Sequence, residues 1–175
     1  MASTGGSDAA RRLTRTLGLI AKMRLLELRV PPPIVGLLLG AGMWAISRET
    51  PPVDVPAYAR LTVAALLLAI GCAFSLGGVI AFRRARTTVS PMKPETTSAL
   101  VTDGVYRITR NPMYVGFLVI LVAWAVFLSS AWALSGPVVF VLYITRFQIV
   151  PEEKALRAMF GESFTSYQAK VRRWL

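Results

Sequence analysis

The sequence contains no histidine and only one cysteine, Cys72, among its 175 residues. The missing histidines remove the commonest metal ligand and the commonest general base of proteins. We therefore expect no metal site, no haem and no Ser-His-Asp triad. A single cysteine forms no disulfide within the chain, and its apolar neighbours predict a small core or lipid-facing residue.

Charge is absent from two long stretches of the chain. Leu61 to Phe82 contains 22 uncharged residues, and Asn111 to Thr145 contains 35. Uncharged runs of this length, in a chain with 54% hydrophobic residues, are typical of an integral membrane protein. The fold class that we expect is all-α, with about four transmembrane helices.

Acidic residues are scarce, at 9 against 20 lysines and arginines, and the net charge is +11. Nucleic-acid binding is one explanation of such a charge, but its distribution favours another. With an even number of crossings, every basic residue except Arg48 and Arg60 lies on one face of the membrane. This positive-inside pattern predicts two cytoplasmic termini and a face that attracts anionic lipid headgroups, so we expect no nucleic-acid partner.

The first half of the chain contains a polar start, an amphipathic segment and two apolar segments. Residues 1–10 are small and mostly polar, and we expect residues 1–12 to be disordered. Residues 13–30 alternate apolar and basic side chains with helical spacing, which predicts a helix lying in the membrane interface. Residues 31–89 carry the first two transmembrane helices, over Ile34 to Ser47, which is short for a full crossing, and over Leu61 to Phe82.

Residues 90–175 are expected to form the functional core. The uncharged block 111–145 would be roughly 50 Å long as one helix, against ~30 Å of hydrocarbon, so it predicts a hairpin. Its turn falls at Ser129 to Trp132 or at Gly136-Pro137. The tail from Pro151 predicts a cytoplasmic helical cap, broken at Gly161. Closing the hairpin brings Arg110 and Glu152 to the same end.

Arg110-Asn111-Pro112 begins the hairpin. Pro112 suits the first helical position and Asn111 suits the N-cap. Free N–H groups and Arg110 could together hold a carboxylate of a cofactor or a substrate at this helix start. The alternative is that these residues only begin a helix.

Glu152-Glu153 follows the hairpin, and two adjacent carboxylates near hydrocarbon are costly unless they are solvated or paired. They could simply begin a solvated helix. The functional alternative is that one binds a ligand ammonium or ribose hydroxyls while the other pairs with Arg110 or Arg146. Arg146 also suits an interfacial anchor.

Three tyrosines lie closest to this region in the sequence: Tyr106, Tyr114 and Tyr167. They fit an interfacial aromatic belt, and they also fit stacking on an adenine or cation–π contact with a sulfonium. Gly104 and Gly161 have the character of turn residues.

These motifs together resemble the isoprenylcysteine carboxyl methyltransferase and phospholipid methyltransferase superfamily. The resemblance runs from Ser90 to the C-terminus. It is carried by Thr102-Asp103-Gly104-Val105-Tyr106-Arg107, Arg110-Asn111-Pro112-Met113-Tyr114, Glu152-Glu153, Phe160-Gly161 and Val171-Arg172-Arg173-Trp174. The eukaryotic carboxyl methyltransferases have Arg-His-Pro at Arg110-Asn111-Pro112, so the chain resembles bacterial-type members more closely.

The resemblance implies S-adenosylmethionine as the methyl donor and a lipophilic acceptor that enters from the bilayer. Arg110, Arg146 and Glu152 are the candidate catalytic residues: an arginine would orient a carboxylate, and a glutamate would accept the proton of an amine or thiol. The residues that it implies for cofactor binding are Thr102, Gly104, Tyr106, Asn111, Pro112, Tyr114, Glu152 and Glu153.

Several functions fit this resemblance. The acceptor could be an isoprenylcysteine-type carboxylate, a phospholipid amine or a small thiol. A membrane redox protein and a non-catalytic membrane adaptor of the same fold are alternatives from other classes. The abundance of alanine, arginine, valine and leucine indicates a GC-rich bacterial source, hence the bacterial plasma membrane. The sequence does not set the oligomeric state.

Overall fold

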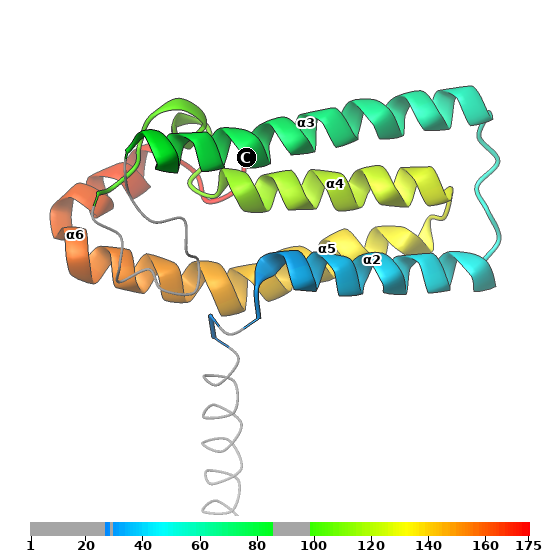
Figure 1. Cartoon of the computed structure of the whole chain (residues 1–175). Coiled ribbons are helices and arrows are strands. Elements are labelled where there is room, and N and C mark those ends of the chain that lie inside the picture. Colours follow the sequence, from blue (N-terminus) through cyan, green and yellow to red (C-terminus); the bar gives the residue numbers. More distant parts are fainter. Residues whose placement is uncertain (1–26, 29, 86–98) are drawn as a thin grey trace, which may run out of the picture.

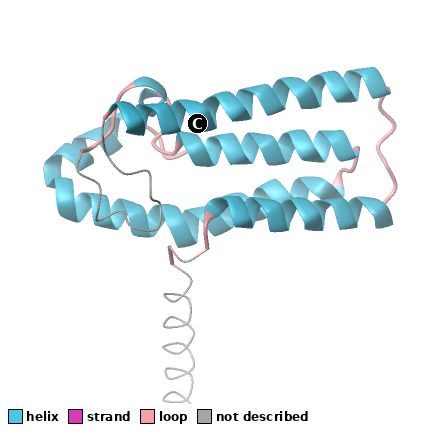
Figure 2. Cartoon of the chain, in the orientation of Figure 1, coloured by secondary structure: helices cyan, strands magenta, loops and turns pink. Residues whose placement is uncertain are grey.

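The computed structural model describes residues 27, 28, 30–85 and 99–175. Within these ranges the chain is helical and contains no strand, which confirms the predicted all-α class (Figure 2). The predicted disorder of residues 1–12, nearly all of the amphipathic helix 13–30 and most of the connector before Leu100 lie outside the described residues.

Four apolar helices lie side by side (Figure 1). The chain runs along α2 and returns along α3, then passes out along α4 and back along α5. A short π-helical turn, η4, joins α5 without a break to α6, which bends back across the end of the bundle. The elements are α2 Pro32–Glu49, α3 Ala57–Arg84, η2 Gly104–Arg107, α4 Pro112–Leu128, η3 Trp132–Leu134, α5 Ser135–Ile144, η4 Thr145–Ile149 and α6 Val150–Lys170.

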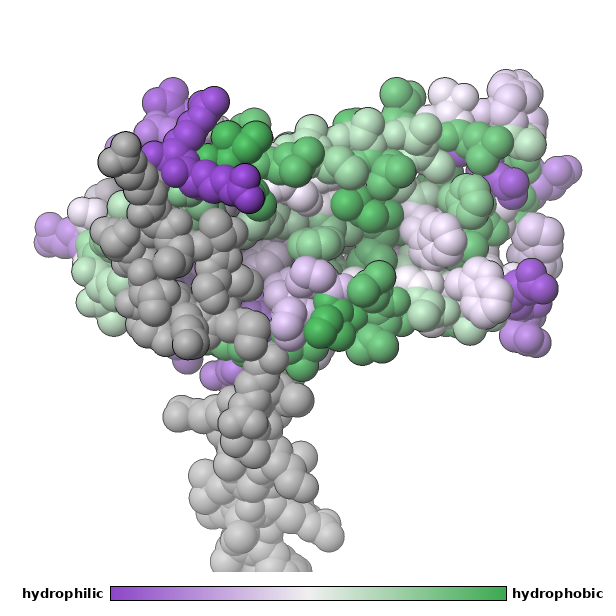
Figure 3. Space-filling model, in the orientation of Figure 1, coloured by the Kyte–Doolittle hydropathy of each residue, from purple (hydrophilic) through white to green (hydrophobic). Residues whose placement is uncertain are grey.

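Hydrophobic side chains cover the outside of the bundle. Leu37, Leu66 and Leu142 are each at least 60% exposed, and Figure 3 shows hydrophilic residues gathered at the two ends of the visible face. Two described helices are long and apolar enough to cross a membrane, α3 and the continuous helix Trp132–Lys170, whereas α4 is shorter. An apolar exterior of this kind suits a lipid environment. The predicted count of four crossings stays a prediction.

The turn of the hairpin lies at Ser129, which ends α4 in the left-handed conformation with φ 53°. The first of the two predicted turn positions is therefore correct. The second is wrong, because Gly136 and Pro137 are buried inside α5. The loop between α2 and α3 is tied to this turn: Val53 N–H donates to Ser129 O at 2.7 Å, and Ser129 Oγ donates to Val53 O at 2.7 Å.

α3 and α4 pack through glycine. A Cβ at Gly116 would lie 2.6 Å from the carbonyl oxygen of Gly71, and one at Gly71 would lie 2.8 Å from the carbonyl oxygen of Gly116. Small residues permit such backbone approach between membrane helices. On the other side of α4, the buried side chains of Met43, Phe140 and Ile144 fill the space between α2 and α5.

The π-helical turn η4 is bonded to the chain that precedes α2. Pro151 has no N–H to give to the carbonyl of Phe147, four residues earlier. Leu28 N–H donates to that carbonyl instead, at 3.0 Å. Gln148 Nε2 donates to Val30 O at 2.8 Å. The entry to α2 and the start of α6 are thereby held together.

Candidate functional site

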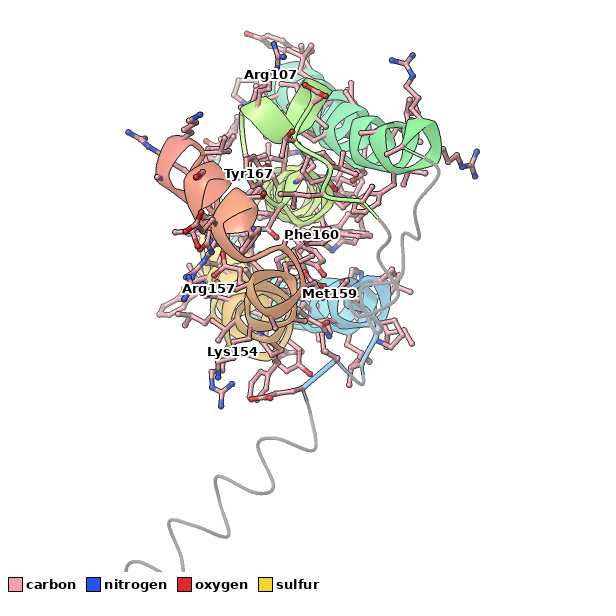
Figure 4. The ribbon with its side chains drawn as sticks, turned by 90° about the vertical axis from the view of Figure 1, so that its left-hand side faces the viewer. Arg107, Lys154, Arg157, Met159, Phe160 and Tyr167 are labelled. Atoms are coloured by element: carbon pink, nitrogen blue, oxygen red, sulfur yellow. The ribbon has the colours of Figure 1, made fainter. Side chains whose placement is uncertain are left out.

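The candidate site lies where α6 crosses the end of the bundle. Gly161 divides α6 with φ 49° and ψ −121°, a conformation that glycine adopts at little cost, and the predicted break is confirmed. Figure 4 views this end: Tyr167, in the second half of α6, lies near α4, while Lys154 and Arg157 lie toward the outside. Because of the bend, the end of α6 reaches the start of α4.

Arg110 joins these two elements. Its Nη2 donates to Glu153 Oε1 at 3.0 Å, and the two side chains are only 12% and 13% exposed. Its Nη1 donates to the carbonyls of Gln168 and Val171 at 3.0 and 2.9 Å. The predicted meeting of the two ends of the hairpin, and the predicted pairing of a glutamate with Arg110, are both present.

The residues around Arg110 also hold the end of the chain. Arg110 N–H donates to Arg172 O at 2.9 Å, and Thr109 Oγ1 and Asn111 Nδ2 donate to Arg173 O at 3.2 and 2.9 Å. Asn111 occupies the N-cap position of α4 as predicted, but its side chain makes no capping bond. The predicted cap is therefore wrong in its chemistry, because the amide is drawn to the tail.

Glu153 is shared between two arginines. Besides the bond from Arg110, it accepts two from Arg173: Nε to Oε1 at 3.0 Å and Nη2 to Oε2 at 2.6 Å. Hydrogen bonding to Glu153 raises the pKa of Arg173. With three charge-assisted hydrogen bonds from two arginines, Glu153 joins α6 to the start of α4 and to the tail.

Glu152 has a different environment. Tyr114 Oη donates to its Oε1 at 2.5 Å, while its Oε2 has no partner in the described part of the chain. The residue lies in α6, beyond the apolar part of the helix. Burial raises the pKa of the Glu152 carboxyl to about 8, which the hydrogen bond from Tyr114 lowers and the charge of Glu153 raises. One carboxylate oxygen is thus held in place and the other is available to a ligand.

Tyr106 and Tyr167 form the apolar wall beside this pair. Tyr167 Oη donates to Tyr106 O at 2.7 Å, and the Tyr106 ring meets Phe82 edge to face at 5.5 Å. Burial holds the pKa of both tyrosines above the usual value; for Tyr106, the nearby Tyr167 and the charge of Glu152 add to it. Tyr106 is 5% exposed, so it belongs to the core of this end.

The remaining predicted cofactor residues lie around the start of α4. Pro112 is buried at the first turn of α4. Thr102 is partly exposed, and Gly104 is exposed with φ 64°, the turn conformation predicted for it. A backbone segment of this kind is free to approach a ligand.

Arg146 pairs with a residue outside the Glu152-Glu153 pair, and its predicted catalytic role stays a prediction. Its Nη1 donates to Glu27 Oε1 at 2.7 Å, and its guanidinium lies 5.4 Å from the centre of the Phe147 ring. Among the described residues it has no ion pair with Glu152 or Glu153. The alternative partner predicted for the glutamates is therefore wrong, because Arg146 lies on the turn that binds the chain before α2.

Two residues of the site were not among the predicted site residues, Thr109 and Arg173. Thr109 is fully buried and bonds both Arg173 O and the N–H of Asn111. No local signal marks it. Arg173 stands in a short Arg-Arg-Trp run that contributes to the family resemblance, but the sequence does not show its pairing with Glu153.

Comparison with known proteins identifies the family. Residues 59–163 match the phospholipid methyltransferase family, which is more than half of the chain. The chain belongs to this family of methyltransferases. The superfamily predicted from the motifs is confirmed, and its members are membrane proteins that require a methyl donor. The matched range includes Arg110, Tyr114, Glu152 and Glu153, but ends before Arg173.

Relatives carry several names. A probable protein-S-isoprenylcysteine O-methyltransferase of Oryza sativa subsp. indica is 34% identical over 112 residues, 62% of this chain and 57% of that protein. A methanethiol S-methyltransferase of Pseudomonas deceptionensis is 35% identical over 101 residues, 56% of this chain and 35% of that protein. An uncharacterized protein of Haemophilus influenzae is 44% identical over 63 residues, 36% of this chain and all of that protein. No solved structure matches.

Proposed function

We propose that the protein is a membrane-embedded methyltransferase that transfers a methyl group from S-adenosylmethionine to a lipophilic acceptor. The observation that carries this proposal is the Tyr114–Glu152 pair. It joins α4 to α6 within the segment that matches the family, at the end of the bundle where polar groups converge. One oxygen of Glu152 is left for a ligand.

The residues present fit this donor. S-adenosylmethionine, when bound, supplies an electrophilic methyl group on a sulfonium, and it carries an ammonium and ribose hydroxyls. Glu152 Oε2 suits the ammonium or the hydroxyls as an acceptor. Tyr106 and Tyr114 are buried, so in this structure they support the walls of the site and present no open ring face to the donor. The backbone of Thr102 to Gly104 and the start of α4 at Asn111 and Pro112 would line the same site.

The cluster of Glu153, Arg110 and Arg173 has a positioning role in this proposal. Its side chains bond one another and the backbone of the tail. These bonds hold α6 against the start of α4 and thereby fix the position of Glu152, the residue before Glu153. Methyl transfer is an in-line displacement, so the orientation of donor and acceptor and the exclusion of water supply most of the catalysis. A rigid frame around Glu152 serves that purpose.

Two acceptor classes have support. The names of most of the relatives favour an isoprenylcysteine-type carboxylate, which arrives ionised and needs no base. The geometry disfavours a carboxylate held by Arg110, because Arg110 is occupied by Glu153 and carbonyl groups. An amine or thiol acceptor would need Glu152 as its proton acceptor, which requires that the donor leave Oε2 free. The name of the Pseudomonas relative agrees with a thiol. We place the site on the cytoplasmic side of a bacterial plasma membrane, from the distribution of basic residues.

The test is methyl incorporation from radiolabelled S-adenosylmethionine by the full chain in lipid nanodiscs. S-farnesylcysteine, a long-chain thiol and phosphatidylethanolamine are supplied separately as acceptors. We expect one of them to be methylated by the wild type, with a loss of about 100-fold or more in Glu152→Gln. Glu162→Gln, an exposed change on the same helix, should retain activity.

Binding of S-adenosylmethionine is measured on the same samples by calorimetry. A folded protein that neither binds the donor nor methylates any of the three acceptors would contradict the proposal and favour a non-catalytic adaptor. Binding without methylation of these acceptors would leave the donor site supported and refute the three acceptor classes.

A further inference from the structure

A long apolar groove lies on the face of the bundle turned toward the viewer in Figure 3, between α3 above and α2 below, with α4 as its floor. Its volume is about 880 Å³. The described parts of α2 and α3 do not pack along each other, since α3 packs mainly on α4 and α2 packs on α4, α5 and η3. Small residues widen the groove on both sides: Gly36, Gly40, Ala41, Ala64 and Ala65.

The lining is hydrocarbon along its length and includes Leu37, Leu68, Phe117 and Phe127. A volume of this size is typical of sites for small molecules. Two indole N–H groups belong to the lining. That of Trp124 donates to Gly40 O at 3.0 Å, and that of Trp44 lies toward the end where Arg48 follows on α2. The body of the occupant must therefore be apolar.

Arginine continues both walls at the end opposite to the candidate site. On α2, Gly40, Trp44 and Arg48 follow one another at four-residue spacing, so they share one face of the helix. Arg48 lies over the Trp44 ring at 5.7 Å from its centre. On α3, Arg60 precedes the lining residue Ala64 by four residues, so these two also share one face of their helix.

Neither arginine has an ion-pair partner in the described part of the chain. The Nε of Arg60 is buried and has no hydrogen-bond partner there. Glu49 and Asp54 belong to the same end, but no ion pair joins them to Arg48 or Arg60. Two unpaired guanidinium groups at the end of an apolar groove complement a molecule with a hydrocarbon body and a phosphate head.

We infer that this groove is a binding site for one phospholipid of the leaflet opposite to the candidate site. An acyl chain lies between α2 and α3 on the floor of α4, and the phosphate lies between Arg48 and Arg60. The lipid replaces the missing contact between α2 and α3. The site is separate from the proposed methyl-transfer site, because none of Tyr114, Glu152 and Arg110 lines the groove.

The test is native mass spectrometry of the full chain in detergent, titrated with phosphatidylglycerol and, separately, with diacylglycerol. The wild type should retain one phosphatidylglycerol more tightly than further copies, and more tightly than diacylglycerol. Gly36→Leu fills the groove, because no atom lies within 4 Å of a Cβ at Gly36. We expect this substitution to lower the affinity for the first bound lipid about tenfold.

Matched controls separate the groove from general effects. Gly42→Leu makes the same change at another open position of α2 that does not line the groove, and it should leave binding unchanged. The double variant Arg48→Gln/Arg60→Gln should lower the affinity for phosphatidylglycerol several-fold and that for diacylglycerol little, since the two arginines bind the phosphate. Arg84→Gln, at the other end of α3, should change neither.

Three results would overturn the inference. One is an equal effect of Gly36→Leu and Gly42→Leu on binding of the first lipid. Another is a dimer that Gly36→Leu dissociates, which would assign the groove to a second copy of the chain. The third is competitive displacement of the lipid by S-farnesylcysteine, which would assign it to the acceptor. Circular dichroism checks that each variant is folded.

Discussion

Two neighbouring glutamates occupy opposite electrostatic environments at the candidate site. Glu153 is neutralised by Arg110 and Arg173, whereas Glu152 is bonded to the neutral hydroxyl of Tyr114. Desolvation penalises the charge of Glu152, and no arginine compensates it within the described chain. A bound cation would supply that compensation, so binding of a cationic ligand and ionisation of Glu152 are linked.

The pH dependence of S-adenosylmethionine binding follows from this linkage. With the pKa of Glu152 raised to about 8, the ionised form becomes rarer by a factor of about ten for each unit that the pH falls. We expect the wild-type dissociation constant, measured by calorimetry between about pH 5.5 and pH 7, to increase by nearly that factor per unit as the pH falls. Glu152→Gln should bind weakly and without this slope; a slope that persists in it would contradict the assignment.

The free energy of unfolding should change in the opposite direction without ligand. A carboxyl whose pKa is raised in the folded state contributes most to the free energy of unfolding at low pH. That contribution is lost as the pH rises from about 4.3 to about 8. The melting temperature of Glu152→Gln should therefore rise relative to that of the wild type as the pH increases across this interval.

Arg110 and Arg173 share Glu153 but differ in their other bonds. Arg110→Gln removes the bonds to Glu153, Gln168 and Val171, and we expect it to lower the free energy of unfolding by about 2–4 kcal/mol. Arg173→Gln should lower it by about 1 kcal/mol, since Arg173 is 38% exposed and Arg110 still pairs with Glu153.

The control for this pair is Arg107→Gln. Its bond to Asp103 is exposed on both sides, so its removal should change the free energy of unfolding by less than about 0.5 kcal/mol. Chemical unfolding in detergent, followed by circular dichroism, gives all three values. Equal losses in Arg107→Gln and Arg110→Gln would contradict the structural role of the cluster.

At the level of elements, the crossing of α3 and α4 depends on two glycines. Gly116→Ala places a methyl group 2.6 Å from the carbonyl oxygen of Gly71, which is backbone and cannot turn away. We expect a loss of about 2–3 kcal/mol in the free energy of unfolding. Gly42→Ala meets no atom within 4 Å and should be neutral or stabilise α2 by up to about 1 kcal/mol. A neutral Gly116→Ala would refute the close crossing.

The elements were largely predictable, because uncharged runs and punctuating residues are local signals. The runs 34–47 and 61–82 lie within α2 and α3, and Ser129 and Gly161 break the helices as predicted. The continuity of α5 with α6 was not predictable. Pro151 suggested a helix start, whereas the chain continues through η4 because Leu28 bonds the carbonyl that Pro151 leaves free.

The candidate site was predictable only in part, for a related reason. The Arg110 and glutamate motifs are short, distinctive segments. The bond of Thr109 to Arg173 joins residues 64 positions apart, and no local sequence pattern near either residue predicts it. The same motifs led us to treat Asn111 as a cap and Arg146 as a partner of the glutamates, and in both cases a distant segment supplied a better partner.

For the whole molecule, the two ends of the bundle should lie on opposite sides of the membrane. In a Cys72→Ala background, Asp54→Cys marks the loop between α2 and α3, and Lys154→Cys marks α6. A membrane-impermeant maleimide added to intact cells should label the first variant, and the second only after permeabilisation, because the basic face is expected inside. The reverse pattern would place the candidate site outside the cell.

The hydrogen bonds between η4 and the segment before α2 should make the position of Glu152 sensitive to bilayer thickness. A thinner or thicker bilayer changes the tilt of apolar helices. Any tilt of α2 displaces Leu28 and Val30, which are bonded to Phe147 and Gln148, and so reaches Glu152 less than two turns later. Affinity for S-adenosylmethionine should therefore depend on acyl-chain length, with an optimum in nanodiscs of matching thickness. Gln148→Leu, which removes the bond to Val30, should flatten that optimum.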